Sequence, residues 1–228
     1  LRPAPTGPDG LSHAPCHRNP EMPRCLPPCQ AAGTLRPRLA AMKPLDQCLL
    51  YAFVDSAYLD DRDPVELCRQ LCEGGADLVQ LRAKDRPVDD IARLAKRLVP
   101  ITAGAGVRLV INDHPQLAAE VGAPTAHLGQ EDFFDAGHRH VDEVKPGGAA
   151  LELGLSSHAP KQAVRACEAG ADYVAIGPVF ATPTKPGRPP VTLDYVRWAT
   201  ANIDRPWFAI GGIDLDNLDD ILAAGGRR

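Results

Sequence analysis

Seven short apolar runs recur along the chain at intervals of about one strand plus one helix. They cover residues 49–54, 78–81, 108–111, 125–128, 150–155, 173–176 and 207–210. Their first residues lie 29, 30, 17, 25, 23 and 34 positions apart, which is the spacing of βα units. Runs that stay apolar, without strict alternation, are typical of parallel strands that are covered on both faces. The chain is therefore predicted to form a parallel α/β sheet.

Segments with helical patterns separate these runs. Asp63 offers an N-cap, followed by Pro64 at the first helical position and Glu66 as a capping-box acid. A second helix is expected to begin near Pro87, and later ones near residues 115–121, 160–169, 193–201 and 216–224. The weakest pattern is that of residues 133–144.

A short phrase recurs where each helix meets the next strand. It reads EGGADLVQL at 73–81, EVGAPTAHL at 120–128 and EAGADYVAI at 168–176. Its glycine supplies the left-handed C-cap that ends a helix before the chain turns. A fourth copy, AAGGRR at 223–228, begins in the same way, and a strand is expected to follow it.

Seven strands are one fewer than a closed parallel barrel needs. We predict a TIM (β/α)8 barrel over residues 42–228, truncated at its C-terminus so that the eighth strand and helix are missing. The alternative, an open doubly wound sheet, is disfavoured because no Gly-rich turn follows the first apolar run. Truncation would leave two unpaired sheet edges, so the chain is expected to be poorly folded or weakly active.

Residues 1–41 differ from the rest of the chain. They hold nine of the 23 prolines and no sustained apolar period, so they cannot bury enough surface to offset their ordering entropy. We interpret them as a disordered Pro-rich leader, a transit segment or a non-native extension. The net charge of −4 argues against a nucleic-acid partner, and no run reaches the 18 apolar residues of a membrane span. A cytoplasmic location is expected.

In a parallel barrel the residues that follow each strand gather at one face, where the chemistry takes place. Two acids, Asp113 and Asp132, follow neighbouring strands, which lie about 4.8 Å apart in a sheet. Two carboxylates, with the other positions left to water and phosphate, are how Mg²⁺ is usually held. An alternative for Asp113 is to cap the helix that starts at Pro115.

Cationic residues are expected at the same face. Arg82 and Lys84 alternate along the end of the second strand and so point the same way, and Lys185 lies in a Thr-Pro-Thr-Lys-Pro-Gly loop. Three cations and a metal indicate an anionic ligand, most simply a diphosphate. Thr182 and Thr184 add hydroxyl donors, and the glycine pair Gly211-Gly212 lets the backbone approach a ligand closely.

Histidines and cysteines give weaker indications. His127 and His158 could each act as a general acid or base, but structural roles are favoured for both. Cys68 and Cys72 are four residues apart on a predicted helix. They are interpreted as core residues of one helix turn, with a metal pair as the alternative.

The motifs VQLRAKD, VINDHPQLAAEVGAPTAHLGQED, LGLSSH, ADYVAIGPVFATPTKPG and FAIGGI resemble thiamine phosphate synthase in order and spacing. The resemblance runs from Leu49 to about Ala224. It implies a TIM barrel that joins 4-amino-2-methyl-5-hydroxymethylpyrimidine diphosphate to 4-methyl-5-(2-phosphoethyl)thiazole, giving thiamine phosphate and diphosphate. It further implies Mg²⁺ and a dissociative substitution without a protein nucleophile.

The resemblance also implies residue roles. The pyrimidine diphosphate would be held by Gln80, Arg82, Lys84, Asn112, Ser156 and Lys185, with Lys84 and Lys185 stabilising the diphosphate. The thiazole phosphate would contact Thr182, Pro183, Thr184 and Gly212. The metal would be held by Asp113 and Asp132. Ala83 and His114 depart from the family pattern, which commonly has glutamate and arginine at these places.

Two rival functions stay open. A thiazole tautomerase or regulator relative of the same fold would bind thiazole phosphate without the diphosphate-binding residues. A non-catalytic ligand-binding barrel is a second alternative, made more plausible by the predicted truncation. The resemblance leaves open whether the chain forms a homo-oligomer.

Overall fold

The computed structural model describes residues 41–147, 149–182 and 189–228. The predicted leader therefore lies outside the described residues, apart from Ala41. All seven predicted strands are present. They are β1 (Tyr51–Asp55), β2 (Leu78–Arg82), β3 (Arg108–Asn112), β4 (Thr125–Leu128), β5 (Glu152–Ser157), β6 (Tyr173–Ile176) and β7 (Trp207–Ala209).

The predicted helices are also confirmed within the described part of the chain. They are α1 (Pro64–Glu73), α2 (Val88–Ala105), α3 (Pro115–Val121), α4 (Pro160–Glu168), α5 (Thr192–Asn202) and α6 (Leu218–Ala223). Asp63 caps α1 as expected, because its side chain accepts hydrogen bonds from the backbone N–H groups of Val65 and Glu66. The repeated glycine also acts as predicted at the helix ends, with Gly122 at φ 77° and Gly170 at φ 84°.

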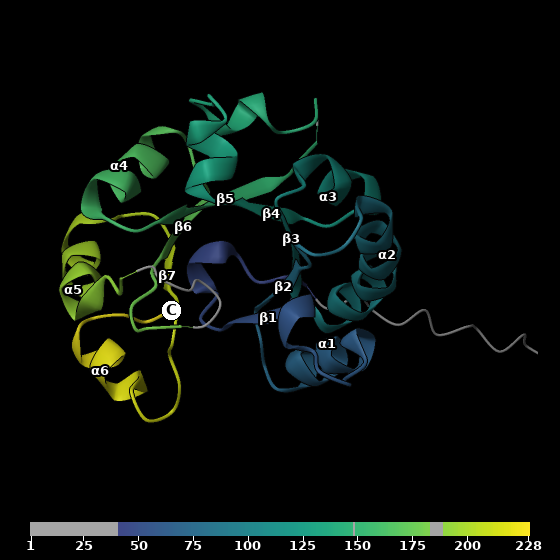
Figure 1. Cartoon of the computed structure of the whole chain (residues 1–228), viewed down its shortest axis with the longest axis horizontal. Helices are drawn as coiled ribbons and strands as arrows, with labels where there is room; N and C mark the ends of the chain where they lie inside the picture. Colours follow the sequence, from purple (N-terminus) through teal and green to yellow (C-terminus); the bar gives the residue numbers. More distant parts are fainter. Residues whose placement is uncertain (1–40, 148, 183–188) are drawn as a thin grey trace, which may run out of the picture. The chain divides into compact units, whose positions relative to one another are not determined.

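The strands form one parallel sheet in the order of the sequence, from β1 to β7. Figure 1 looks along the strands and shows the sheet curving part of the way round a barrel, with the helices on its outside. This sequential order differs from the strand order of a doubly wound sheet, which reverses at a switch point. β1 and β7 are the two edges, so one side of the curved sheet is open.

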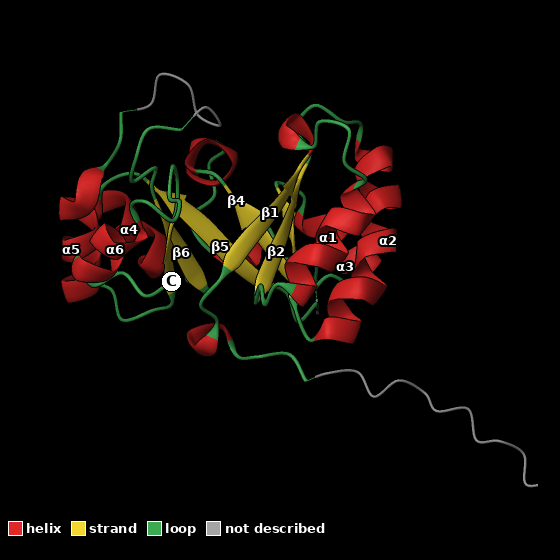
Figure 2. Cartoon of the chain, turned by 90° about the horizontal axis from the view of Figure 1, so that it is seen from below, coloured by secondary structure: helices red, strands yellow, loops and turns green. Residues whose placement is uncertain are grey.

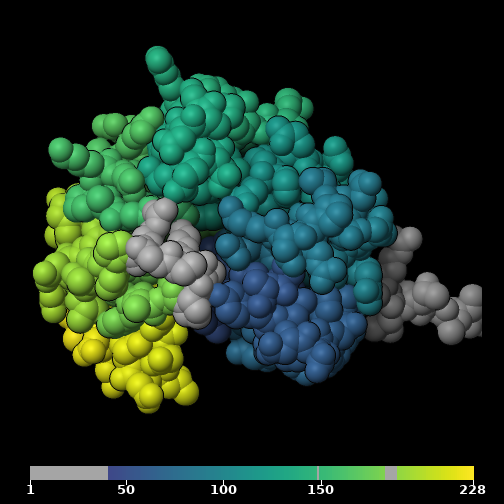
Figure 3. All heavy atoms as spheres, in the orientation of Figure 1, coloured from purple at the N-terminus to yellow at the C-terminus, as the bar shows by residue number. Residues whose placement is uncertain are grey.

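The open side of the sheet separates the segment before β1 from the segment after β7. In Figure 3 the yellow segment that contains α6 and the blue segment around α1 stand apart at the surface. Leu49 and Leu50, just before β1, are about half exposed, and so is Leu222 of α6. These three leucines expose apolar surface in the cavity along the open side.

The main core lies between the sheet and the helices. Strand residues such as Leu109, Leu153 and Val174 are buried there against Leu98 of α2 and Val196 of α5. A smaller cluster fills the inner side of the curved sheet. Its members are Leu45, Cys48, Leu78, Val110, Tyr173 and Phe208. Both faces of the sheet are therefore buried, as the continuous apolar runs predicted.

Two boundaries differ from the sequence prediction. β1 begins at Tyr51 rather than residue 49, because the backbone N–H groups of Leu49 and Leu50 donate to the carboxylate of Asp77, at 2.7 and 3.1 Å. β5 begins at Glu152 rather than residue 150. The poorly patterned region 133–144 contains only the wide turn Glu131–Asp135 and the 3-10 turn Val141–Glu143.

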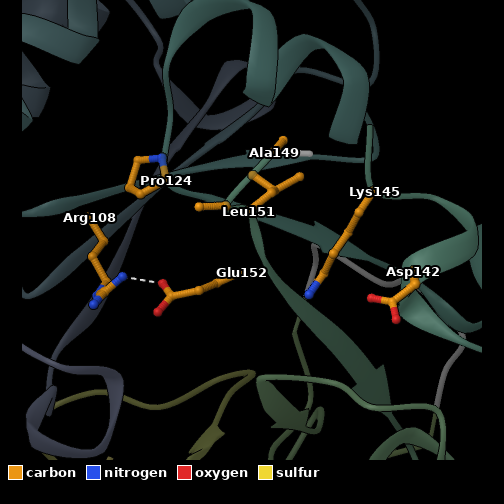
Figure 4. Close-up of a pocket in the computed structure, with 8 residues that line it drawn as sticks. Arg108, Pro124, Asp142, Lys145, Ala149, Leu151 and Glu152 are labelled. Carbon is orange, nitrogen blue, oxygen red and sulfur yellow. Dashed lines mark hydrogen bonds and ion pairs between the residues drawn. The ribbon is translucent and has the colours of Figure 1, made fainter. Parts of the chain in front are cut away.

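Charged residues close the N-terminal end of the sheet, which we call the foot. Arg108 donates to the carbonyl of Lys43 at 3.0 and 2.8 Å and forms an ion pair with Glu152. Figure 4 shows this ion pair at the edge of a shallow hollow of about 490 Å³, which Lys145 also lines. The foot is thus held by side chains that already have partners.

The two cysteines of α1 lie against the core, as their interpretation from the sequence requires. Cys68 is fully buried and Cys72 partly buried. The described residues contain no cluster of three or more His, Cys, Asp or Glu side chains arranged to hold a metal. Over the same residues, none of the helices has the length and apolar composition that crossing a bilayer requires.

Candidate active site

The opposite end of the sheet, where the strands have their carboxyl ends, carries the predicted site residues. We call this end the mouth; it faces upward in Figure 2. A cavity of about 940 Å³ lies there and continues along the open side between β1 and β7. Nine predicted site residues line it, namely Gln80, Arg82, Lys84, Asn112, Asp113, Asp132, Ser156, Thr182 and Gly212. The predicted residues Pro183, Thr184 and Lys185 lie outside the described residues.

The two predicted metal ligands lie close together around one ammonium group. The Nζ atom of Lys84 is 2.9 Å from a carboxylate oxygen of Asp113 and 3.6 Å from one of Asp132. Lys84 follows β2, Asp113 follows β3, and Asp132 lies in the turn after β4. Three neighbouring strands therefore bring one cation and two anions to a single point, as the sequence predicted.

Asp113 has an unusual backbone conformation. Its φ angle is 63°, in the left-handed region that few residues other than glycine adopt. Its backbone N–H donates to the carbonyl of His127 at 2.8 Å, which ties this conformation to β4. The alternative helix-capping role is not seen, because the N-cap of α3 is His114. Strain at a residue that points into a cavity is typical of functional sites.

A glycine makes room for Asp132. A Cβ atom added to Gly129 would lie 2.8 Å from the Oδ2 atom of Asp132 and 3.4 Å from the Oε2 atom of Glu131. The turn Glu131–Asp135 is wider than an α-helical turn, a geometry that often occurs at functional sites. The Gly-Gln-Glu-Asp stretch therefore lets two carboxylates turn toward the mouth.

The charges shift one another's protonation. Burial raises the pKa of Asp113, the contact with Lys84 opposes that rise, and the neighbouring Asp132 carboxylate adds to it. Burial lowers the pKa of Lys84, but Asp113 and Asp132 outweigh burial, so the net shift is upward. Lys84 thus stays protonated, whereas Asp113 takes up a proton more readily than an ordinary aspartate.

The donor set at this point fits one kind of metal. Two aspartates supply hard oxygen donors, and the described residues add no histidine or cysteine that would complete a zinc cage. Mg²⁺ is commonly bound by one or two carboxylates, with water and substrate phosphate in its other positions. Asp113 and Asp132 therefore suit Mg²⁺ better than a soft metal.

Arg82 is fixed by a residue that sequence reasoning missed. Its Nη1 atom lies 2.7 Å from the Oδ2 atom of Asp55, and both side chains are largely buried. Asp55 also accepts a hydrogen bond from the backbone N–H of Ala57. Asp55 comes directly after an apolar run, as Asp113 does with one residue between, and that position could have identified it.

The inner side of the mouth holds a buried group of polar residues. Gln80, Asn112 and Ser156 are each less than a tenth exposed. His127 contacts Ser156 and Tyr173 through its two ring nitrogens, in agreement with the structural role favoured for it. His158 lies at the rim of the cavity, where its ring nitrogen Nδ1 is hydrogen-bonded to the carbonyl oxygen of Gly177.

The glycine pair before α6 packs closely against another loop, and its predicted approach to a ligand stays a prediction. A Cβ atom on Gly212 would lie 2.6 Å from the carbonyl oxygen of Ala181, and one on Gly211 would lie 2.4 Å from Cβ of Pro178. The close approach is therefore to the loop that follows β6. Gly212 still lines the cavity, with φ 65°.

Comparisons with known proteins agree with this geometry. A family model described as thiamine monophosphate synthase matches residues 50–228. Thiamine-phosphate synthase of Thermus thermophilus is 49% identical over 156 residues, covering 68% of this chain and 72% of the relative. The protein of the same name from Thermobifida fusca is 41% identical over 188 residues, covering 82% and 84%.

A solved structure is also similar. The thiamine phosphate pyrophosphorylase from Pyrococcus furiosus superposes with a TM-score of 0.69 and 27% sequence identity, and the match covers 81% of this chain and 85% of that one. The family match covers the whole sheet and both carboxylates of the mouth. The chain belongs to the thiamine monophosphate synthase family.

Proposed function

We propose that this chain joins 4-amino-2-methyl-5-hydroxymethylpyrimidine diphosphate to 4-methyl-5-(2-phosphoethyl)thiazole, forming thiamine phosphate and releasing diphosphate. One observation carries the proposal. The ammonium group of Lys84 lies between Asp113 and Asp132, within a cavity that Arg82 also lines. Cations beside a pair of carboxylates suit a diphosphate that is bound together with a divalent metal.

Asp113 and Asp132 would hold Mg²⁺ in the loaded enzyme. When bound, the metal would offset the negative charge of the leaving diphosphate. Lys84 and Arg82 would add positive charge on the side of β2. Because Asp55 already orients Arg82, little reorganisation of this cation is needed when the diphosphate arrives.

The pyrimidine would lie against the buried polar group of Gln80, Asn112 and Ser156. The thiazole phosphate would contact Thr182 and Gly212, which line the same cavity on the side of β6 and β7. The assignments of Pro183, Thr184 and Lys185 stay predictions.

The chain's contribution to the reaction is binding and electrostatics. The bond between the pyrimidine methylene and the diphosphate oxygen breaks first, and both bonding electrons leave with the diphosphate. The thiazole nitrogen then supplies the electron pair of the new carbon–nitrogen bond. No protein nucleophile takes part, so the mouth has to neutralise the leaving group and keep water from the cation.

The test is diphosphate release by this chain from the two substrates, with and without Mg²⁺. Release that requires both the metal and the thiazole phosphate is expected. Asp132→Asn should abolish most of it. Asp142→Asn, which neutralises an exposed carboxylate at the foot, should leave it unchanged.

The same experiment separates the rival functions. Tight substrate binding without product would favour a non-catalytic barrel. Binding of thiazole phosphate with no affinity for the pyrimidine diphosphate would favour a tautomerase-like relative. Either result would overturn the proposal.

We further propose that the open side between β1 and β7 is the place of an eighth strand, so that the full fold is a TIM (β/α)8 barrel. The backbone N–H of Ala209 donates to the carbonyl of Arg228 at 2.9 Å. The guanidinium of Arg228 donates to the carbonyls of Cys48 and Asp46. Arg228 thus lies between the two sheet edges at the foot.

A variant lengthened beyond Arg228 by an apolar strand tests this fold proposal. Its unfolding temperature should rise, because both edges gain backbone partners and the exposed leucines are covered. An unchanged unfolding temperature would contradict it. The expectation that the 228-residue chain is poorly folded or weakly active stays a prediction, and comparing it with the lengthened variant tests it as well.

Three other predictions concern the chain as a whole. They are the division into residues 1–41 and 42–228, the cytoplasmic location and the oligomeric state, for which a homo-oligomer is one possibility. Mass spectrometry of the native N-terminus would test the first, and sedimentation would test the third.

A further inference from the structure

A continuous chain of hydrogen bonds crosses the inner side of the sheet between two residues of the proposed pyrimidine site. It runs from Gln80 through Tyr51, Tyr173 and His127 to Ser156, and we call these five residues the polar chain. The successive distances are 2.5, 2.8, 3.1 and 2.9 Å. The five residues come from β2, β1, β6, β4 and β5, so the chain links strands that are not all neighbours.

Tyr173 reaches across the sheet because β5 leaves space for its ring. Gly154 and Tyr173 are paired in the sheet, and a Cβ atom on Gly154 would lie 2.0 Å from Cζ of Tyr173. The ring is fully buried and contacts Tyr51 and Phe208 edge-on, with centroids 5.8 and 5.5 Å away. These contacts hold its hydroxyl between Tyr51 and His127.

The first bond sets the direction of the others. An amide nitrogen can only donate, so the hydroxyl oxygen of Tyr51 accepts from Gln80. The buried proton of Tyr51 finds an acceptor within the polar chain only if it is donated to Tyr173, whose own proton then goes to Nδ1 of His127. A neutral His127 with an accepting Nδ1 carries its proton on Nε2, from which it donates to Oγ of Ser156.

Protonation at both tyrosines agrees with this direction. Burial raises the pKa of Tyr51 and of Tyr173, so both phenols keep their protons over the physiological range. The hydroxyl proton of Ser156 is then directed to an acceptor in the cavity, while the amide oxygen of Gln80 stays an acceptor. A matching ligand presents an acceptor to Ser156 and a donor to Gln80.

We propose that Tyr51, Tyr173 and His127 are positioning residues that select an aminopyrimidine over its oxo counterpart. An aminopyrimidine presents a ring-nitrogen acceptor beside an amino donor. The oxo compound presents a ring N–H donor beside a carbonyl acceptor, which is the reverse pattern, so buried groups would be left unpaired. This inference rests on the proposed function, since it concerns the pyrimidine site of the same cavity.

Nitrogen-15 NMR of His127 in the ligand-free chain tests the direction of the polar chain. The Nε2–H tautomer is expected over the neutral pH range, with the signal assigned by its loss in His127→Gln. The Nδ1–H tautomer would mean that the bonds between Tyr51, Tyr173, His127 and Ser156 run the other way, and it would overturn the inference. This measurement does not depend on binding or turnover.

Calorimetric binding of the aminopyrimidine diphosphate and of its 4-oxo analogue, both with Mg²⁺, tests the selectivity. The unmodified chain should prefer the amino compound by about 100-fold or more. Tyr173→Phe keeps the ring but breaks the polar chain, and should reduce this preference about tenfold. Gln80 and Ser156 themselves are unchanged in this variant, so a lost preference cannot come from a lost direct contact.

Tyr195→Phe is the matched control. Tyr195 is another buried tyrosine, and its hydroxyl oxygen lies 2.8 Å from Oγ of Ser157 and 2.8 Å from the carbonyl oxygen of Ala159, outside the polar chain. Its removal should leave the preference unchanged. Equal affinity of the unmodified chain for both compounds, or an unaltered preference in Tyr173→Phe, would overturn the inference. Failure to bind either compound would instead refute the proposed function.

Discussion

The two ends of the parallel sheet carry the same kinds of charged residue but use them differently. At the foot, Asp77 accepts the N–H groups of Leu49 and Leu50 and pairs with Lys43 at 2.6 Å. These interactions, with the carbonyl of Leu50 accepting from the N–H of Leu78, hold the start of β1 against β2. A carboxylate with this many donors stabilises the fold.

At the mouth, neither the backbone conformation nor the charge of Asp113 favours folding. Its φ is 63°, and burial raises its pKa. It shares the ammonium group of Lys84 with Asp132. The comparison supports a division in which the foot serves stability and the mouth serves ligand binding, the division known from parallel β/α barrels.

The largest expected effect comes from neutralising one carboxylate at each end. Asp113→Asn should lower diphosphate release more than about 100-fold, since even the loss of a residue behind a metal ligand costs 10–100-fold. Its stability at neutral pH should not fall. The folded-state pKa of Asp113 lies above the unfolded value, so its ionisation destabilises the fold as the pH rises, and asparagine tolerates a left-handed backbone.

Asp77→Asn is the matched change at the foot. The pKa of Asp77 is lowered by Lys43 and by the N–H groups of Leu49 and Leu50, although burial opposes this shift. The stability that Asp77 contributes to the fold is therefore present above its unfolded-state pKa and is lost as the pH falls. The variant should unfold more easily by about 1–2 kcal/mol while its folded fraction stays active. Thermal unfolding and diphosphate release, measured on both variants, would contradict the division if the effects were reversed.

The next effect concerns Arg108, whose guanidinium binds Glu152 and the carbonyl of Lys43. Arg108→Ala should lower the free energy of unfolding by about 2 kcal/mol, less than for a fully buried pair because Glu152 is partly exposed. Denaturant unfolding measures this change. The affinity for the pyrimidine diphosphate should not change; a large loss of affinity at unchanged stability would show that the foot takes part in binding.

A smaller effect is expected from lysines at the two ends. Lys84→Ala should weaken binding of the pyrimidine diphosphate about tenfold, because one charge-assisted contact is lost. Lys145→Ala removes an ammonium group 3.2 Å from Asp172, and calorimetry should detect no change in affinity. Equal losses in the two variants would point to a general effect of net charge.

The smallest effect is a shift with pH. Because the pKa of Asp113 is raised, Mg²⁺-dependent binding should decline on acidification at a higher pH than an ordinary aspartate would give. Lys84→Ala should move this decline to higher pH still, since the ammonium group opposes the rise. Calorimetric titrations at several pH values measure both shifts, and a decline at the same pH in both proteins would contradict this explanation.

Much of the site could be predicted because barrel geometry turns sequence positions into spatial ones. Asp113 and Asp132 each follow an apolar run, and neighbouring strands place such residues side by side. The polar chain could not be found in this way. Tyr173 reads as one more apolar strand residue, and its path across the sheet depends on Gly154 in the neighbouring strand.

Strand boundaries that depend on residues far away in the sequence also could not be predicted from local patterns. The apolar pair Leu49 and Leu50 continues the strand pattern, yet both N–H groups are taken by Asp77, more than twenty residues away. The packing of the glycine pair Gly211 and Gly212 was not visible in the sequence either, while its predicted close approach to a ligand stays a prediction. Its close contacts with Pro178 and Ala181 depend on how the loop after β6 packs.

The central claim is that Asp113 and Asp132 bind a metal together with the diphosphate at the mouth. Calorimetric binding of the pyrimidine diphosphate to the unmodified chain and to Asp113→Asn, each with and without Mg²⁺, tests it most directly. The metal should strengthen binding at least tenfold in the unmodified chain and leave it unchanged in the variant. An equal gain from Mg²⁺ in both proteins would contradict the claim.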